Sequence, residues 1–299
     1  MRNKWIFGLC LIIFLFLISY GIMFFYLKGD SNVKGNSFIV LPMSGGISID
    51  GSGDFLMPGG VSSTQFVQKL KELEENPSVK GVIIEINSGG GSVVASEDIV
   101  NALKHMNKTT YAVVREVGAS GAYWVASATD RIYASPVSMT GSIGVVGSYL
   151  EFEDLFKKYG VGYERLVAGE YKDMGTPFRG LTDDEKAIMQ HKLSLIHDYF
   201  ILDVARNREM SEEQVRKLAN GQFYLGIEAK EYGLIDRLGN TDDALNDMKQ
   251  EIGDYPVKRI SEKKSILEFI GLSSYYLGKG IGTELGKKLE LKNELEIKS

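Results

Sequence analysis

The stretch Gly81-Val-Ile-Ile-Glu-Ile-Asn-Ser-Gly-Gly-Gly-Ser92 decides the fold. Its first half is a short run rich in Val and Ile, as in a buried strand, and its second half is a glycine-rich turn. A helical pattern follows over about 94–106, and a second apolar run begins at Tyr111. This order of strand, turn, helix and strand predicts a βαβ unit with parallel strands.

The same alternation extends in both directions. Upstream lie the strand-like Phe38-Ile-Val-Leu-Pro42 and a helical pattern over about 64–75, and downstream a long helical stretch runs over about 182–208. These elements predict an α/β fold in which helices flank a largely parallel sheet. Residues 44–60 contain six glycines and few apolar anchors, so we expect a loop there, either a connector or a substrate-facing flap.

The N-terminal region predicts a membrane anchor. Residues 5–27 carry no charge over 23 positions, which as a helix would span roughly 34 Å. The alternative is a cleavable signal peptide, whose apolar core is shorter, about 7–15 residues, and ends in a small-residue cleavage site. Basic residues flank the run on both sides, so charge does not fix its orientation. The short head, residues 1–4, favours a cytosolic N-terminus and an extracytoplasmic domain at the cell membrane.

Composition defines the remaining organisation of the 299-residue chain. We expect a linker at 28–36, a folded domain at 37–257 and a charged, partly helical tail at 258–299. The net charge of −5, without a basic stripe, argues against a nucleic-acid partner. The single cysteine, Cys10, lies in the apolar run, so neither an internal disulfide nor a cysteine-based zinc site can form.

Two strand-to-helix turns could carry chemistry. The turn at 87–92 leaves backbone N–H groups free to bind an anion, either a phosphate or the oxyanion of acyl transfer, and the nucleotide-binding motifs are absent. The second turn is Gly118-Ala-Ser-Gly-Ala-Tyr123. It places the Ser120 hydroxyl beside a helix N-terminus, where the Gly121 amide could donate to an oxyanion. Ser120 could equally serve only as a helix cap.

A nucleophilic serine needs a base, and the three histidines are poor candidates. His105 lies in a polar helix end, and His191 and His197 are six residues apart, so they do not share a helix face. The other base used with serine is a lysine held neutral by burial, because a lysine is ordinarily protonated below about pH 10.4. Lys172 is the best candidate because of its apolar and aromatic sequence neighbours, although Asp173 beside it would oppose loss of the proton.

The chain resembles the signal peptide peptidase A family, the membrane-anchored serine–lysine peptidases of bacteria. The resemblance spans roughly residues 37–245. The blocks that carry it are Asn87-Ser-Gly-Gly-Gly91, Gly118-Ala-Ser-Gly-Ala-Tyr123, Thr140-Gly-Ser-Ile-Gly-Val145, Ala168-Gly-Glu-Tyr-Lys-Asp173 and the segment 221–236. One position departs from the family pattern, because Gly89 stands where the family usually has proline, which loosens the turn but leaves its amides in place.

The resemblance implies a site and an assembly. Ser120 would be the nucleophile and Lys172 the general base, with Ser142 hydrogen-bonded to the lysine amine. The oxyanion hole would consist of the Gly91 and Gly121 amides, with no metal or other cofactor. The fold would be that of Clp protease and crotonase subunits, built of repeated ββα units. The subunits would form a homo-oligomeric ring in which one subunit's lysine serves the next subunit's serine.

The sequence therefore predicts a membrane-anchored serine endopeptidase that degrades short hydrophobic peptides, such as remnant signal peptides. Two alternatives stay open. One is an α/β-hydrolase-type esterase that uses Ser120 with His191 or His197, for which the Gly118-Ala-Ser-Gly-Ala turn is only a near match. The other is a catalytically silent scaffold that keeps the ring and binds peptides.

Overall fold

The computed structural model describes residues 35–51 and 60–260. The chain divides into two compact units at Arg259, and the elements below belong to the first. The anchor predicted at 5–27 and nearly all of the tail predicted at 258–299 lie outside the described residues. Within the described residues, no helix combines the length and apolar character needed to span a bilayer.

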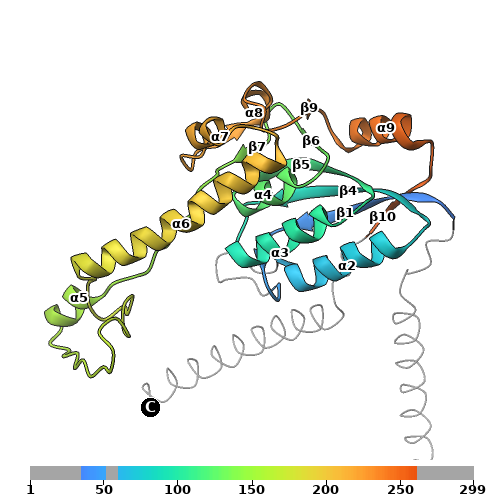
Figure 1. The fold of residues 1–299 in the computed structure, drawn as a ribbon. Coiled ribbons are helices and arrows are strands. Elements are labelled where there is room, and N and C mark those ends of the chain that lie inside the picture. The colour runs from blue at the N-terminus through green and yellow to red at the C-terminus, as the bar shows by residue number, and fades with distance from the viewer. Residues whose placement is uncertain (1–34, 52–59, 261–299) are drawn as a thin grey trace, which may run out of the picture. The chain divides into compact units, whose positions relative to one another are not determined.

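A largely parallel sheet forms the centre of the first unit (Figure 1). Its main path runs in the order β10-β1-β4-β5-β6-β9, with β7 paired to β5 and β8 antiparallel to β7. The strands on the path are β1 (Ser37–Ser44), β4 (Val79–Ser88), β5 (Thr109–Ala119), β6 (Arg131–Ala134), β9 (Arg237–Leu238) and β10 (Val257–Arg259). The two strands off the path are β7 (Met139–Gly141) and β8 (Phe223–Leu225). A separate parallel pair consists of β2 (Gly46–Ser48) and β3 (Gly60–Ser62).

The helices connect and cover these strands. They are α2 (Ser63–Glu75), α3 (Val93–Lys104), α4 (Gly121–Ser127), α5 (Glu153–Lys158), α6 (Asp183–Asn207), α7 (Glu212–Leu218), α8 (Gly226–Glu231) and α9 (Thr241–Ile252). The predicted strand and helix alternation is confirmed, since α3 connects β4 to β5 and α4 connects β5 to β6, with both strand pairs parallel.

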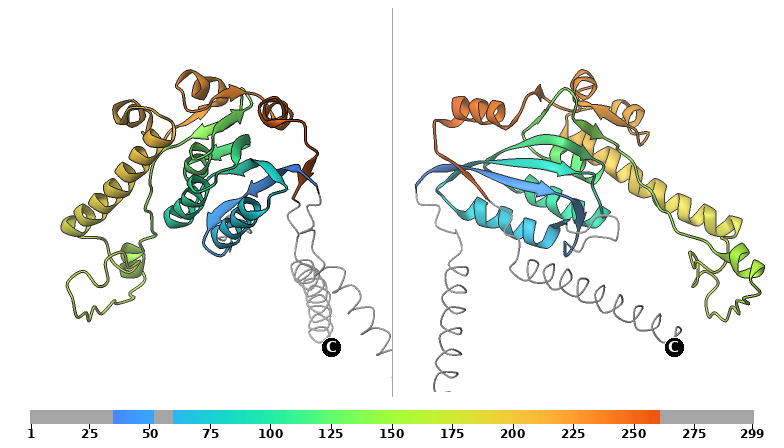
Figure 2. Two further views of the ribbon diagram at one scale, coloured as in Figure 1. Left: turned by 45° about the vertical axis from the view of Figure 1, so that its right-hand side comes forward. Right: turned by 180° about the vertical axis from the view of Figure 1, so that it is seen from behind.

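Helices cover both faces of the sheet (Figures 1 and 2). On one face, Ala244, Leu245 and Met248 of α9 pack against buried side chains of the central strands, among them Ile83 and Val113. Helices α2 and α3 lie side by side on the other face, where α3 also contacts α4. Burial on both faces explains why the central strands are continuous apolar runs rather than alternating ones.

An arm extends from this body. Residues 146–182, including α5, and the first half of α6 lie away from the sheet in both figures. Most of the large apolar side chains on this segment are exposed, with Leu166 at 93% and Val146 at 85%. The arm therefore leaves an apolar surface without cover from the described part of its own chain.

The glycine-rich segment 44–60 differs from the expected loop. It contains β2, whose Ile47 is only 2% exposed and forms a parallel bridge with Gly91. The buried Ile47 side chain, its backbone hydrogen bonds to the glycine turn and the pairing of β2 with β3 order this part of the segment, so the expectation of no regular element was wrong for 46–48. At the other end, β10 pairs with β1 and carries the folded unit to Arg259, two residues past the expected boundary at 257.

The core position Ile83 provides a stability test. The Ile83 side chain is fully buried between the sheet and α9, whereas Ile227 is 57% exposed. We expect Ile83→Ala to lower the free energy of unfolding by about 2–5 kcal/mol, because it leaves a cavity that the packed sheet cannot close. The matched Ile227→Ala should change it by at most about 0.5 kcal/mol. Urea unfolding measures both, and equal losses would contradict this description of the core.

Candidate active site

Ser120 sits in a strained turn between β5 and α4. Its backbone has φ 54° and ψ −126°, a conformation that residues with a side chain rarely adopt and that costs about 1–3 kcal/mol. Two hydrogen bonds hold it there: its N–H donates to the Gly141 carbonyl at 2.8 Å, and its carbonyl accepts from the Trp124 N–H at 3.0 Å. The serine hydroxyl is thus fixed at the N-terminus of α4.

The glycine turn after β4 packs directly on this serine. Gly90 has φ +95°, and a Cβ on it would lie 2.9 Å from the Ser120 Cβ and 2.6 Å from the Gly121 nitrogen. Both the left-handed conformation and the lack of space require glycine at this position. The turn is held in place by Ile47, whose N–H donates to the Gly90 carbonyl and whose carbonyl accepts from the Ser92 N–H.

Two backbone amides are available beside Ser120. The Gly91 nitrogen lies 3.4 Å from the position of a Cβ built on Gly121, so the two glycines are in contact. The bridge to Ile47 uses the amide of Ser92 rather than that of Gly91. Among the described residues, neither the Gly91 nor the Gly121 amide has a protein acceptor. A pair of adjacent N–H groups near a serine hydroxyl can bind the oxyanion of an acyl-transfer intermediate.

Ser142 lies next to this turn. It follows β7, whose Gly141 accepts the hydrogen bond from Ser120, and its own backbone has φ 49°. The Ser142 hydroxyl donates to the Gly221 carbonyl at 3.1 Å. In the described residues of one chain, no lysine amine contacts Ser142, so the hydrogen bond expected from the resemblance is not formed within a single subunit.

A small pocket opens beside Ser120. Its volume is about 110 Å³. The lining is mostly apolar and comes from the glycine turn, α3, α4, α6 and the start of the arm: Gly91, Val93, Ser96, Ser120, Gly121, Trp124, Gly144, Val145, Val146, Ile196 and Phe200. A larger depression of about 760 Å³ contains none of the predicted site residues in its lining.

Lys172 is remote from this pocket within one chain. It lies on the arm, where its backbone N–H donates to the Gly169 carbonyl in a turn and its side chain is exposed. It does not line the Ser120 pocket, and Figure 1 shows the loop around α5 well away from α4. The buried surroundings expected for a lysine base are therefore absent in the isolated chain.

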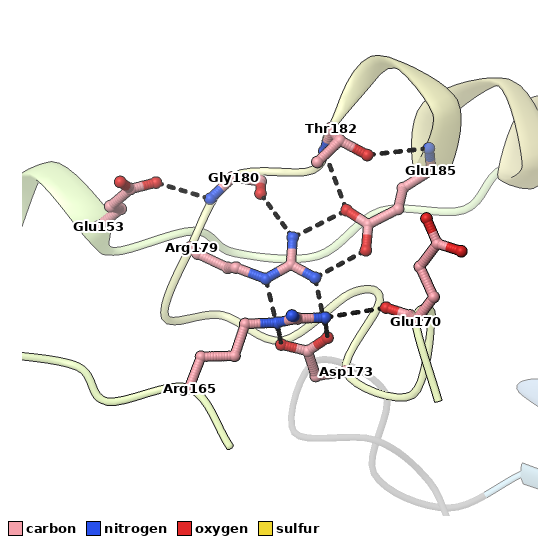
Figure 3. Close-up of polar contacts among 8 residues, drawn as sticks. All are labelled: Glu153, Arg165, Glu170, Asp173, Arg179, Gly180, Thr182 and Glu185. Carbon is pink, nitrogen blue, oxygen red and sulfur yellow. Dashed lines mark hydrogen bonds and ion pairs between the residues drawn. The ribbon is translucent and has the colours of Figure 1, made fainter. Parts of the chain in front are cut away.

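An ion-pair network fixes the loop that carries Lys172 (Figure 3). Arg165 and Arg179 both bind the Asp173 carboxylate, and Arg179 also binds Glu185 of α6, at 2.6 Å. Hydrogen bonds from Arg165 and Arg179 hold the pKa of Asp173 well below its ordinary value. Two guanidinium groups thus already balance the charge of the carboxylate next to Lys172. Asp173 therefore opposes loss of the lysine proton less than its place in the sequence suggested.

The same network joins the loop to the start of α6. Glu185 accepts hydrogen bonds from Arg179 and from the backbone N–H of Thr182, and these bonds lower its pKa to about 2. Because the folded pKa is depressed, this contribution to stability is present above the ordinary value of 4.5 and is lost only as the pH falls toward 2. The loop therefore keeps its connection to α6 at neutral pH.

The hydrogen bonds of the histidines go to backbone carbonyls other than that of Ser120. His105 is exposed at the end of α3, and its Nδ1 lies 2.6 Å from the Asn101 carbonyl. His191 is exposed on α6, and the Nε2 of His197 lies 3.3 Å from the Ile143 carbonyl. In the described part of the chain, no hydrogen bond links Ser120 to a histidine.

Sequence analysis did not identify several residues that shape the site. Gly90 could have been recognised only as one of three adjacent glycines, and Ile47 only as a lone apolar residue in a polar segment. Arg165 and Arg179 gave no signal, because their role depends on how the loop folds. The predicted residues Ser120, Gly91, Gly121 and Ser142 are brought together, whereas Lys172 is not.

Comparisons with known proteins agree with this geometry. The Clp protease family model matches residues 60–140, so this part of the α/β fold resembles that of Clp proteases. The model of peptidase family S49 matches residues 102–253, a range that includes Ser120, Ser142 and Lys172. The chain belongs to peptidase family S49.

Individual relatives are of two lengths. The chain is 37% identical over 247 residues to a protein of Methanocaldococcus jannaschii named as a protease. This alignment covers 79% of this chain and 77% of the Methanocaldococcus protein. It is 31% identical over 268 residues to an Enterococcus faecium protein named as signal peptide peptidase SppA, covering 87% and 75%. Protease 4 of Haemophilus influenzae is 34% identical over 72% of this chain but only 35% of its own length. The solved ClpP catalytic domain of Plasmodium falciparum aligns with a TM-score of 0.44 at 13% identity, over 68% of this chain and 85% of its own.

Two adjacent glycines test the oxyanion site. Gly90→Ala places a Cβ 2.6 Å from the Gly121 nitrogen, whereas Gly89 is exposed and has no atom within 4 Å of its Cβ position. We expect Gly90→Ala to lower kcat/KM for a fluorogenic hydrophobic peptide by at least about 100-fold, because it disturbs the amides beside Ser120. Gly89→Ala should stay within about threefold of the unmodified protein. Equal effects of the two substitutions would contradict the assignment.

Proposed function

We propose that the protein is a membrane-anchored serine endopeptidase of the signal peptide peptidase type, which cleaves short hydrophobic peptides that include remnant signal peptides. Membership of peptidase family S49 supports peptidase activity. The Enterococcus relative is named as a signal peptide peptidase and the Haemophilus relative as a protease. The uncharged run at 5–27 supports a single membrane span, with the catalytic domain outside the cytosol.

The position of Ser120 is the observation that carries this proposal. A strained turn, a helix N-terminus and two amides without a protein acceptor among the described residues support a nucleophilic role for this serine. Within the same residues its side chain makes no capping hydrogen bond, which favours that role over a helix cap. The serine hydroxyl attacks the peptide carbonyl, and the Gly91 and Gly121 amides stabilise the oxyanion. This arrangement serves acyl transfer and needs no cofactor.

The general base in this proposal is Lys172 of a neighbouring subunit. Because Lys172 is remote from Ser120 in its own chain, the arm has to dock on a second copy for the two to meet. The exposed apolar side chains of the arm, such as Leu150 at 72% and Leu166 at 93%, suit an interface between subunits. Burial in that interface would strip water from the amine and favour its neutral form.

The proton follows a defined path through this composite site. The neutral Lys172 amine takes the Ser120 proton as the serine attacks, and the resulting ammonium protonates the leaving amine. Water then attacks the acyl-enzyme as the amine takes a proton from it, and the ammonium returns that proton to the departing Ser120 oxygen. Ser142, one residue beyond the partner of the Ser120 N–H, is placed to exchange its hydrogen bond with Gly221 for one to the incoming amine.

Mixed assemblies test the shared active site. Ser120→Ala and Lys172→Ala should each abolish peptide cleavage in the full chain, because each removes one half of every site. When the two variants are co-assembled in equal amounts, about a quarter of the sites in a ring combine an intact serine with an intact lysine. We therefore expect about a quarter of the original activity to return, measured with a fluorogenic hydrophobic peptide on size-fractionated protein.

Three results would contradict the proposal. Persistent inactivity of the mixture would exclude a shared site. Activity that survives Lys172→Ala but is lost when His191 or His197 is replaced would support an esterase-type triad instead. A well-assembled chain that cleaves no peptide and whose Ser120 does not react with a fluorophosphonate would support the silent scaffold.

A further inference from the structure

The Asp203 carboxylate of α6 binds a residue that lines the Ser120 pocket. The Nζ of Lys104, the last residue of α3, is 2.5 Å from the Oδ1 of Asp203 on α6. The other carboxylate oxygen, Oδ2, accepts a hydrogen bond from the Trp124 indole N–H of α4 at 2.7 Å. The Asp203 side chain is only 8% exposed, so one nearly buried carboxylate connects three helices.

The ring of Trp124 is fixed on several sides. Trp124 is one helical turn after Ser120, is 2% exposed and lines the pocket. Its ring stacks on Phe200 with centroids 4.8 Å apart and meets Tyr199 edge-on at 5.8 Å. Stacking limits how the ring tilts, and the hydrogen bond to Asp203 selects one orientation in its plane, because an indole has a single N–H donor.

The arrangement is more polar than packing alone requires. Only the carboxylate of the pair is buried, since the Lys104 side chain is one third exposed. Removing a carboxylate from water costs free energy, so an apolar side chain of the same volume would be at least as stable there. A phenylalanine at position 124 would need no acceptor. One carboxylate oxygen of Asp203 binds the Lys104 amine and the other accepts from the Trp124 indole. The carboxylate therefore fixes the orientation of the indole ring, which apolar contacts alone would not determine.

We infer that Lys104 and Asp203 are positioning residues that hold the Trp124 ring as a rigid wall of the substrate pocket, so that the residue before the cleaved bond has to be a small aliphatic one. This inference rests on the proposed function and adds that the Ser120 pocket selects substrate side chains by size. The pocket volume of about 110 Å³ supports the size limit, since an apolar cavity of about 150 Å³ in another protein is what holds a benzene molecule.

Cleavage selectivity provides the first test. The full chain is given three peptides that differ only in the residue before the cleaved bond, which is Ala, Val or Phe. We expect Val to be preferred over Phe by at least about tenfold in kcat/KM, and Trp124→Phe, Asp203→Asn and Lys104→Met to reduce that preference to about twofold or less. The kcat for the Ala peptide should change far less than the selectivity. Lys69→Met, on a partly exposed lysine paired with Glu72 on α2, is the matched control and should change neither.

Uniform loss of activity on all three peptides, with the Val-to-Phe ratio unchanged, would overturn the inference, because a merely structural cluster would act in that way. Asp203→Asn removes the charge but keeps the shape of the side chain. A thermal melt of each variant shows whether it is folded under the conditions of the cleavage assay.

A binding measurement separates this inference from the proposed function. The chain has two tryptophans, Trp5 and Trp124, so full-length Trp5→Phe with Ser120→Ala leaves Trp124 as the only indole and cannot cleave through Ser120. We expect Trp124 fluorescence to respond to the Val peptide at a concentration about tenfold lower than to the Phe peptide, and Asp203→Asn to remove that difference. If the unmodified chain cleaves nothing yet binds selectively, the proposed function fails, whereas the size selection by the Trp124 wall is supported. No fluorescence response, or equal affinity for the two peptides, overturns the inference.

Discussion

The contact between the Gly90–Gly91 turn and the first residues of α4 is the constraint on which the rest of the site depends. Ser120 keeps its unfavourable backbone conformation because β7 binds its N–H on one side and Gly90 occupies the space on the other. Any side chain at Gly90 would push the two turns apart. The sheet register that aligns the ends of β4, β5 and β7 therefore also positions the serine and the two amides.

Helix α6 connects the two halves of the proposed mechanism. Near its C-terminus, Phe200 lines the Ser120 pocket and Asp203 binds the Trp124 indole, another part of that lining. At its N-terminus, Glu185 binds Arg179 in the loop that carries Lys172. Only the ends of this 25-residue helix are buried, so its middle spans the distance between pocket and arm without support from the sheet. A helix is stiff enough to hold the lysine loop at a fixed distance from its own serine, which suits a lysine that serves another subunit.

The residues that the sequence identified correctly are those whose signal is local. Strand and helix alternation around Gly81–Ser92 predicted the parallel sheet, and the small residues around Ser120 predicted a strand-to-helix turn there, which the structure contains. Contacts between distant residues gave no such signal. Asp203 lies 79 residues from Trp124 on a helix without a continuous apolar stripe, and the bridge from Ile47 to Gly91 joins two glycine-rich segments. The environment of Lys172 could not be predicted because within one chain it is exposed.

Mapping the residue that reacts with a fluorophosphonate in the assembled full chain tests the central claim most directly. Digestion and mass spectrometry of the labelled protein should locate the adduct on Ser120, with labelling that becomes faster as the pH rises through neutrality and slow in Lys172→Ala. An adduct on another serine, or an unlabelled Ser120 in well-assembled protein, would contradict the account of this turn as the nucleophile site.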